Sequence, residues 1–124
     1  MTYPASFKYT KDHEWLDPAG DHSAVGITDY AQRQLGAVVY VELPEVGTTV
    51  KQGESFGTVE SVKSVSELYA PVSGEIVDVN LALKDKPERV NADPHGSWII
   101  MIKPSVPAEL TTLLDAAQYA ALVA

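Results

Sequence analysis

The feature that most constrains this chain is a near-palindromic stretch, Glu60–Glu67, with one lysine near its middle. On each side lies a run of residues that suits a β-strand. These runs are Phe56–Val59 and Leu68–Ala70. The four residues Val62–Val65 can form a turn that places Lys63 and Ser64 at its tip. Two strands joined by so short a connection pair as a hairpin, so the sequence predicts a stiff β-structure that holds the Lys63 ammonium in water.

Two interpretations of this lysine follow from the local pattern. A lysine at the tip of a hairpin is most often a solvated surface charge with no further role. The same exposed amine is also a usable nucleophile for an acyl-transferring enzyme, and a carboxylic cofactor would join it as an amide. The local pattern by itself leaves both interpretations open.

Composition limits the classes of protein to consider. The 124 residues suit one compact domain, 1–124, and the 45% of hydrophobic residues can bury a core over about residues 7–104. The chain has no cysteine, which excludes disulfides, thiolate metal sites and a cysteine nucleophile. Its formal charge of −8 argues against nucleic-acid binding, which needs the opposite sign. No apolar run is long enough to span a bilayer, so we expect no membrane association.

The N-terminus, Met1–Ser6, has neither a basic region nor an apolar stretch, so no signal peptide is visible. We therefore expect a cytoplasmic protein if the source is bacterial. A processed eukaryotic form in the mitochondrial matrix would have the same appearance.

The rest of the chain reads as mainly β. Short strands are predicted at 7–10, 13–16, 23–28, 38–43, 48–51, 75–80 and 98–102. Residues 17–21 carry a strong turn signal. Thr28 or Asp29 can cap a short helix that runs to Leu35 and ends at Gly36. Residues 81–96 read mostly as loop, with a helical turn capped by Asn80.

The C-terminal segment, 105–124, is predicted to be helical. Ser105 can cap the helix, and Pro107 is tolerated in its first turn. The leucines that follow have helical spacing, and a break is expected near Asp115. We expect this segment to lie against the β-core.

A weak internal repeat also appears. Val38–Val41 corresponds to Ile76–Val79, and Thr49–Gln52 corresponds to Arg89–Ala92, each about 40 residues from its mate. Two copies of such a unit could face each other as a flattened barrel.

The lysine stretch and several other blocks resemble one known family. ESVKSVSELYAPVSGEI, at residues 60–76, is similar to the lipoyl-attachment region of the H protein of the glycine cleavage system. Further blocks resemble that family in its order: Tyr9–Trp15, Val25–Gln32, Val41–Gly47, Ser97–Trp98 and Ile102–Pro104. The resemblance covers about residues 7–115, and five ordered blocks are far more specific than one short motif.

The resemblance implies a non-catalytic carrier with lipoate bound covalently to Lys63 as N6-lipoyllysine. It implies a lipoyl-domain-like flattened barrel or sandwich of two pseudo-symmetric sheets, with short helices and a C-terminal helix. The implied partners are a pyridoxal-phosphate glycine decarboxylase, an aminomethyltransferase, a dihydrolipoyl dehydrogenase and lipoate-attaching enzymes. The carrier would move the aminomethyl group of glycine from the decarboxylase to the aminomethyltransferase.

The same resemblance implies roles for residues around the lysine. Recognition by the attaching enzyme would use Glu60, Val62, Ser64, Val65 and Glu67. For Glu60 and Glu67, the alternative is an ion pair with the unmodified lysine, worth ~0–1 kcal/mol.

The loaded arm would carry an ammonium group, which a carboxylate in a cleft would hold and shield from water. The candidates for this role are Asp12, Glu14 and Glu67, and Glu14 fits best because it lies in the family-like His13–Trp15 block. Ordinary surface acids are the alternative for all three.

The alternatives to this carrier are a biotin carrier, a lipoyl-relay protein and an enzyme. A biotin carrier would share the architecture, but such proteins generally place methionines beside the lysine, where Val62 and Ser64 stand here. A lipoyl-relay protein would use the same residues. An enzyme would need a convergent polar pocket, which these residues do not assemble. The three histidines have no metal-like spacing, so neither a metal site nor a catalytic residue is predicted.

Overall fold

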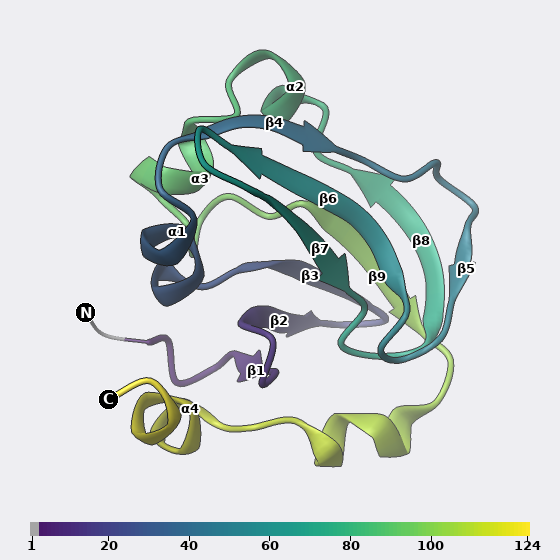
Figure 1. The fold of residues 1–124 in the computed structure, drawn as a ribbon. Helices are drawn as coiled ribbons and strands as arrows, with labels where there is room; N and C mark the ends of the chain where they lie inside the picture. Colours follow the sequence, from purple (N-terminus) through teal and green to yellow (C-terminus); the bar gives the residue numbers. More distant parts are fainter. Residues whose placement is uncertain (1–2) are drawn as a thin grey trace.

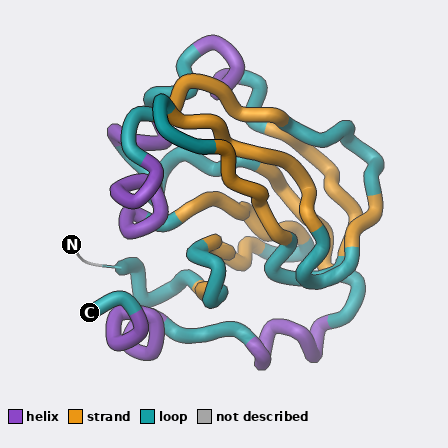
Figure 2. The backbone as a smooth tube through the Cα atoms, viewed as in Figure 1, coloured by secondary structure: helices purple, strands orange, loops and turns teal. Residues whose placement is uncertain are grey.

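The computed structural model describes residues 3–124 and consists of two antiparallel sheets with short helices around them (Figures 1 and 2). The larger sheet has the strand order β1 (Lys8–Tyr9), β2 (Glu14–Ala19), β3 (His22–Ile27), β9 (Ile100–Pro104), β8 (Gly74–Val79) and β5 (Thr49–Val50). The smaller sheet has the order β4 (Val38–Glu42), β6 (Ser55–Ser61) and β7 (Val65–Tyr69). No ladder joins the two sheets within residues 3–124, so the arrangement is an open sandwich and not a closed barrel.

The main core lies between the two sheets. The smaller sheet contributes Val41, Val59 and Leu68, and the larger sheet contributes Ile76 and Ile102, all of them buried. Side chains of this kind each stabilise the fold by about 1.5–3 kcal/mol when they leave water. The smaller sheet lies across the larger one in Figure 1, so these apolar faces meet. The mainly β fold class predicted from sequence is confirmed.

The predicted first helix is confirmed as α1 (Asp29–Leu35). The Thr28 side chain accepts a hydrogen bond from the Ala31 N–H and so caps the helix N-terminus. Gly36 ends the helix with a φ of 80°, a left-handed conformation that glycine adopts without steric cost. Leu35 is buried and Ala31 packs against the core, as their spacing predicted.

The strand and turn predictions for residues 13–21 need correction. β2 continues through Pro18 to Ala19, and the turn to β3 is confined to Gly20 and Asp21. Pro18 is tolerated in the strand because β1 pairs only with Trp15 and Leu16, which leaves this part of β2 at an open edge.

The predicted helical turn after Asn80 becomes two short helices, α2 (Ala82–Asp85) and α3 (Arg89–Ala92). Asn80 does not cap α2 with its side chain, because its amide donates instead to the Trp98 carbonyl at 2.8 Å. The last strand also differs from the predicted 98–102. It starts two residues later and ends at Pro104, whose partner across the ladder is Gly74.

The C-terminal segment is interrupted near Asp115, as predicted. Its first part is a 3₁₀-helix, η1 (Pro107–Thr112), and Ser105 does not cap it, because the capping position is Val106 and no side chain bonds there. The second part is α4 (Ala116–Leu122), which Asp115 caps through a reciprocal pair of bonds with Gln118.

A second hydrophobic cluster fastens α4 to the body of the protein. Tyr119 is fully buried against Tyr9, with ring centroids 4.8 Å apart, and Phe7 stacks on Trp15 at 4.6 Å. The first described residues and the C-terminal helix therefore lie on the same side of the molecule, as Figure 1 shows.

The predicted internal repeat is present only in part. Val38–Val41 and Ile76–Val79 both lie in strands, but Thr49 and Val50 form β5 whereas Arg89–Ala92 is the helix α3. The two sheets also differ in size, with three strands and six.

Candidate functional site

The hairpin that carries Lys63 forms as predicted, but its turn lies one residue earlier. The strand ladder ends at the pair Glu60 and Val65. The Ser61 N–H donates to the Ser64 carbonyl at 2.8 Å, and the Ser61 hydroxyl accepts the N–H groups of Lys63 and Ser64 at 3.3 and 3.2 Å. The serine hydroxyl therefore organises the turn, and Val62 and Lys63, not Lys63 and Ser64, occupy its middle.

The tip of this hairpin rests on the connection between α1 and β4. The Val62 N–H donates to the Ala37 carbonyl at 3.0 Å. The Lys63 side chain passes over Gly36, with its Cε 3.6 Å from the point where a β-carbon on residue 36 would lie. Lys63 itself is exposed, so its amine is held at the surface on a supported turn.

A cleft of about 290 Å³ opens beside this tip. Its walls come from β7, the strand that follows the tip, from α1, from the end of β3 and from the segment at the start of β2. Its lining residues are Asp12, His13, Glu14, Ile27, Ala31, Gln34, Leu35, Ser64, Val65, Ser66, Glu67 and Leu68. The three acids predicted from sequence, Asp12, Glu14 and Glu67, thus line one cleft although they come from two distant segments.

Glu14 differs from an ordinary surface acid because only 2% of it is exposed. Its carboxylate accepts the Thr10 hydroxyl at 2.7 Å and the Tyr69 N–H at 3.2 Å. Burial raises the pKa of Glu14 from 4.5 to about 7, and the two hydrogen bonds only partly offset this effect. A carboxyl group with such a pKa is poised to change its charge when a cation enters the cleft.

A second cavity, of about 210 Å³, lies on the other side of the same two acids. Asp12 and Glu14 line it together with Tyr69 and Pro71, which follow the hairpin, and with Leu114 from the C-terminal segment. The two cavities therefore follow β7 away from the lysine tip, and Glu14 borders both.

The C-terminal helix α4 contacts the loop that precedes Glu14. The Tyr119 hydroxyl lies 2.8 Å from Nδ1 of His13 and 2.7 Å from the Thr28 hydroxyl. His13 has a φ of 73°, a left-handed conformation that is rare for a residue with a side chain. Sequence reasoning missed Tyr119, since its contacts lie 106 and 91 residues away along the chain and no local pattern marks them.

The residues predicted for recognition by the attaching enzyme differ in how far they are exposed around the tip. Val62 and Val65 are 72% and 63% exposed, which is unusual for valine and leaves two apolar side chains beside the lysine. Glu60 is half-buried and pairs across the sheet with Val65, while Ser64 is exposed in the turn. Glu67 is exposed and accepts a hydrogen bond from the Ser55 hydroxyl.

Within residues 3–124, no group of three or more histidine, aspartate or glutamate side chains is arranged to hold a metal ion. Over the same residues, no helix is both long and apolar enough to cross a membrane.

The tip and the cleft fit a long acyl chain on Lys63. Ile27, Ala31 and Leu35 give the cleft apolar lining, and Asp12 and Glu14 add carboxyl groups to the same cleft. An apolar arm with a cationic end would match this combination of surfaces. The arrangement offers carriage and shielding.

Comparisons with known proteins point the same way. The family profile described as Glycine cleavage H-protein matches residues 7–124. The glycine cleavage system H protein of Anaeromyxobacter sp. (strain K) is 56% identical over 99% of this chain and 97% of its own length. That of Geobacillus kaustophilus is 53% identical over 99% and 98%. A crystal structure of a glycine cleavage system H protein from Mycobacterium marinum matches with a TM-score of 0.89 and 46% identity, over 96% of this chain and 97% of that one. These matches support the lipoyl carrier and not the biotin-carrier or lipoyl-relay alternative.

Proposed function

The chain belongs to the glycine cleavage H-protein family, and from this premise we propose that Lys63 is the residue that carries its lipoyl group. The protein is a non-catalytic carrier that moves the aminomethyl group of glycine within the glycine cleavage system. When bound, lipoate supplies the sulfur chemistry that a chain without cysteine lacks. The observation that carries the assignment is the exposed Lys63 amine in a supported turn beside an acid-lined cleft.

The residues around the tip support recognition by a lipoate-attaching enzyme. Val62 and Val65 present apolar surface on either side of the amine, and Ser64 extends the exposed turn. Glu60 and Glu67 supply negative charge on the two strands that lead to it. An enzyme that binds this tip would contact a rigid backbone turn from which the lysine side chain extends.

Glu14 and Asp12 form the docking site for the loaded arm in this proposal. An ammonium near the Glu14 carboxyl would lower its pKa again, because an opposite charge favours the ionised form. The resulting ion pair lies in a buried place, where charges interact more strongly than in water. The walls of the cleft exclude water from the group that is being carried.

The companion proteins follow from the same proposal. They are a pyridoxal-phosphate glycine decarboxylase, an aminomethyltransferase, a dihydrolipoyl dehydrogenase and the enzymes that attach lipoate. The named relatives come from bacteria, which supports a location in the bacterial cytoplasm. The whole chain, 1–124, would act as one carrier domain, with a core at about 7–104 and the helical segment 105–124 closing one side.

The decisive experiment compares two lysine variants. After co-expression with a lipoate-attaching enzyme, intact-mass measurement should show one lipoyl addition on the wild-type protein and none on Lys63→Arg. The control is Lys51→Arg, an exposed lysine in the turn between β5 and β6, which should be modified like wild type. Glycine breakdown with the companion enzymes should be lost in Lys63→Arg and retained in Lys51→Arg and wild type. A lipoyl addition on Lys63→Arg, or a biotin mass on the wild type, would refute the assignment.

A further inference from the structure

The turn that carries Lys63 packs on residues 36–38, which comprise the connection after α1 and the first residue of β4. We call these three residues the seat of the turn. Three contacts join tip and seat: the Val62 N–H to the Ala37 carbonyl at 3.0 Å, the stem of Lys63 over Gly36, and the pairing of Val38 with Ser61 at the end of the ladder. The direction in which the hairpin presents its amine therefore depends on where this seat is held.

Asn91, on α3, holds the seat on both sides of Ala37. Its Oδ1 accepts the Val38 N–H at 2.8 Å, and its Nδ2 donates to the Gly36 carbonyl at 2.8 Å. The Ala37 carbonyl, which receives the Val62 N–H, lies between these two anchored residues in the chain. One side chain thus fixes the peptide units before and after the contact point.

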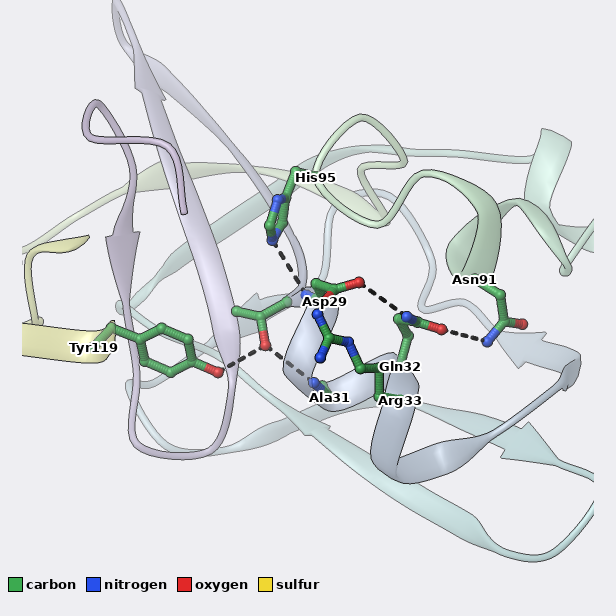
Figure 3. A network of polar contacts seen from close by, with 8 residues as sticks. Asp29, Ala31, Gln32, Arg33, Asn91, His95 and Tyr119 are labelled. Atoms are coloured by element: carbon green, nitrogen blue, oxygen red, sulfur yellow. Dashed lines mark hydrogen bonds and ion pairs between the residues drawn. The ribbon is translucent and has the colours of Figure 1, made fainter. Parts of the chain in front are cut away.

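Both hydrogens of the Asn91 amide are used, and its oxygen accepts one hydrogen bond. The second hydrogen of Nδ2 goes to Oε1 of Gln32 at 2.9 Å, and Gln32 in turn donates to Asp29 at 3.0 Å. Figure 3 shows this row of contacts running from Asn91 along α1 to the start of the helix. Only a side-chain amide both donates two hydrogens and accepts one, so neither aspartate nor an apolar residue could replace all three bonds.

We propose that Asn91 is a positioning residue for the modification of Lys63, acting through residues 36–38 and the Val62 amide. This inference rests on the proposed function of Lys63 as the lipoyl attachment site. Asn91 is not among the residues that line the cleft, and its role is to keep the tip in one orientation before the attaching enzyme arrives. If the tip is already ordered, binding to the attaching enzyme costs less conformational entropy.

The test compares Asn91→Ala with Asn80→Ala. Asn80 lies in the same connecting region and its side chain donates one hydrogen bond, to the Trp98 carbonyl at 2.8 Å, away from the seat. Asn91→Asp is the second variant, because it keeps an acceptor for the Val38 N–H but cannot donate to Gly36. The readouts are hydrogen exchange at the Val62 amide and the initial rate of lipoylation by a purified lipoate-attaching enzyme.

In Asn91→Ala, exchange at the Val62 amide should rise about tenfold, the ratio that corresponds to loss of a hydrogen bond's stabilisation. The kcat/KM for lipoylation should fall by a similar factor, mainly through KM, since the chemistry at the amine is unchanged. Asn91→Asp should be impaired in both readouts. Asn80→Ala should match wild type in both, and the amide of Val59, inside the ladder, should stay protected in every variant.

Equal lipoylation rates for Asn91→Ala and Asn80→Ala would overturn the inference while leaving the assignment of Lys63 intact. So would faster exchange at Val59 together with Val62, because that pattern means general loosening of the fold. If Asn91→Ala does not fold, Asn91→Asp is judged against Asn80→Ala by the same criteria. A wild-type protein that stays unmodified at Lys63 would refute the proposed function and this inference together.

Discussion

Glu14 combines burial, hydrogen bonds and a titratable carboxyl at the boundary of two cavities. Proteins rarely bury an acid unless it is paired or neutral. With a pKa of about 7, this carboxyl is partly protonated near neutral pH, so the free protein need not bury a full negative charge. A cationic cargo would supply the missing partner charge, and docking would then be coupled to release of a proton.

The raised pKa of Glu14 predicts how stability depends on pH. Below pH 4.5 the carboxyl is protonated in folded and unfolded chains alike. As pH rises towards 7 the unfolded chain loses this proton first, so the free energy of unfolding falls, by about 3 kcal/mol in all. Glu14→Gln has no such proton to lose. Denaturant unfolding between pH 4.5 and 8 should therefore show the free energy of unfolding of wild type falling relative to that of Glu14→Gln as pH rises.

The matched control for this prediction is Glu75→Gln, which changes an exposed acid on β8. Its curve should run parallel to that of wild type across the whole range. Parallel curves for wild type and Glu14→Gln would contradict the prediction and would mean that the carboxyl has the same pKa in the folded and unfolded chains.

The functional residues differ in how visible they are in the sequence. The exposed position of Lys63 on its hairpin, and the cap and stop of α1 at Thr28 and Gly36, were predicted correctly because each depends on its immediate neighbours. Asn91 and Tyr119 were missed because their partners lie on other elements. That Glu14 is buried was also missed, since a Glu between a His and a Trp carries no local sign that a distant strand covers it.

Among the elements, prediction succeeded where local pattern and tertiary setting agree. The hairpin β6–β7 and the helix α1 have strong signals of their own. β2 runs past a proline because its neighbour β1 is short, and α2 and α3 are single turns whose short patterns resemble loop. These outcomes depend on pairing partners elsewhere in the chain, which no short window of sequence contains.

The helix α4 illustrates how one element supports the site from a distance. Its seven residues are too few to form a stable helix alone, so its stability comes from docking. Tyr119 provides that docking through stacking on Tyr9 and through its hydroxyl, which meets His13 and Thr28. Thr28 also caps α1, so the helix, the cap and the loop before Glu14 form one connected unit.

Tyr119→Phe should therefore cost more stability than a typical loss of one hydroxyl. It leaves the fully buried Thr28 hydroxyl and the His13 ring short of a partner, and we expect a loss of about 1–3 kcal/mol in the free energy of unfolding. Tyr9→Phe is the control, because the Tyr9 hydroxyl makes one bond, to the Pro4 carbonyl at 2.7 Å. Chemical denaturation of both variants measures which of them loses more of the free energy of unfolding. A loss in Tyr119→Phe no larger than in Tyr9→Phe would contradict it.

At the scale of the whole molecule, the sheet beside Lys63 carries negative charge only. Strands β4, β6 and β7 contain Glu42, Glu60 and Glu67 and no lysine or arginine. Glu60 pairs across the sheet with Tyr40 and Val65, and Thr58, two residues before Glu60, pairs with Glu42 and Glu67. Residues paired across strands, and those two apart along a strand, share a face, so all three acids point the same way.

This acidic face predicts that partners approach Lys63 under electrostatic attraction. The kcat/KM for lipoylation should fall several-fold as ionic strength rises from about 0.02 to 0.3 M, because salt shortens the range of the attraction to well below 10 Å. In Glu60→Gln/Glu67→Gln this dependence should flatten. Glu75→Gln/Asp85→Asn removes the same charge from exposed positions on β8 and α2 and should keep the wild-type slope. If both double variants flattened the slope equally, attraction would depend on the net charge of −8 and not on the face beside the lysine.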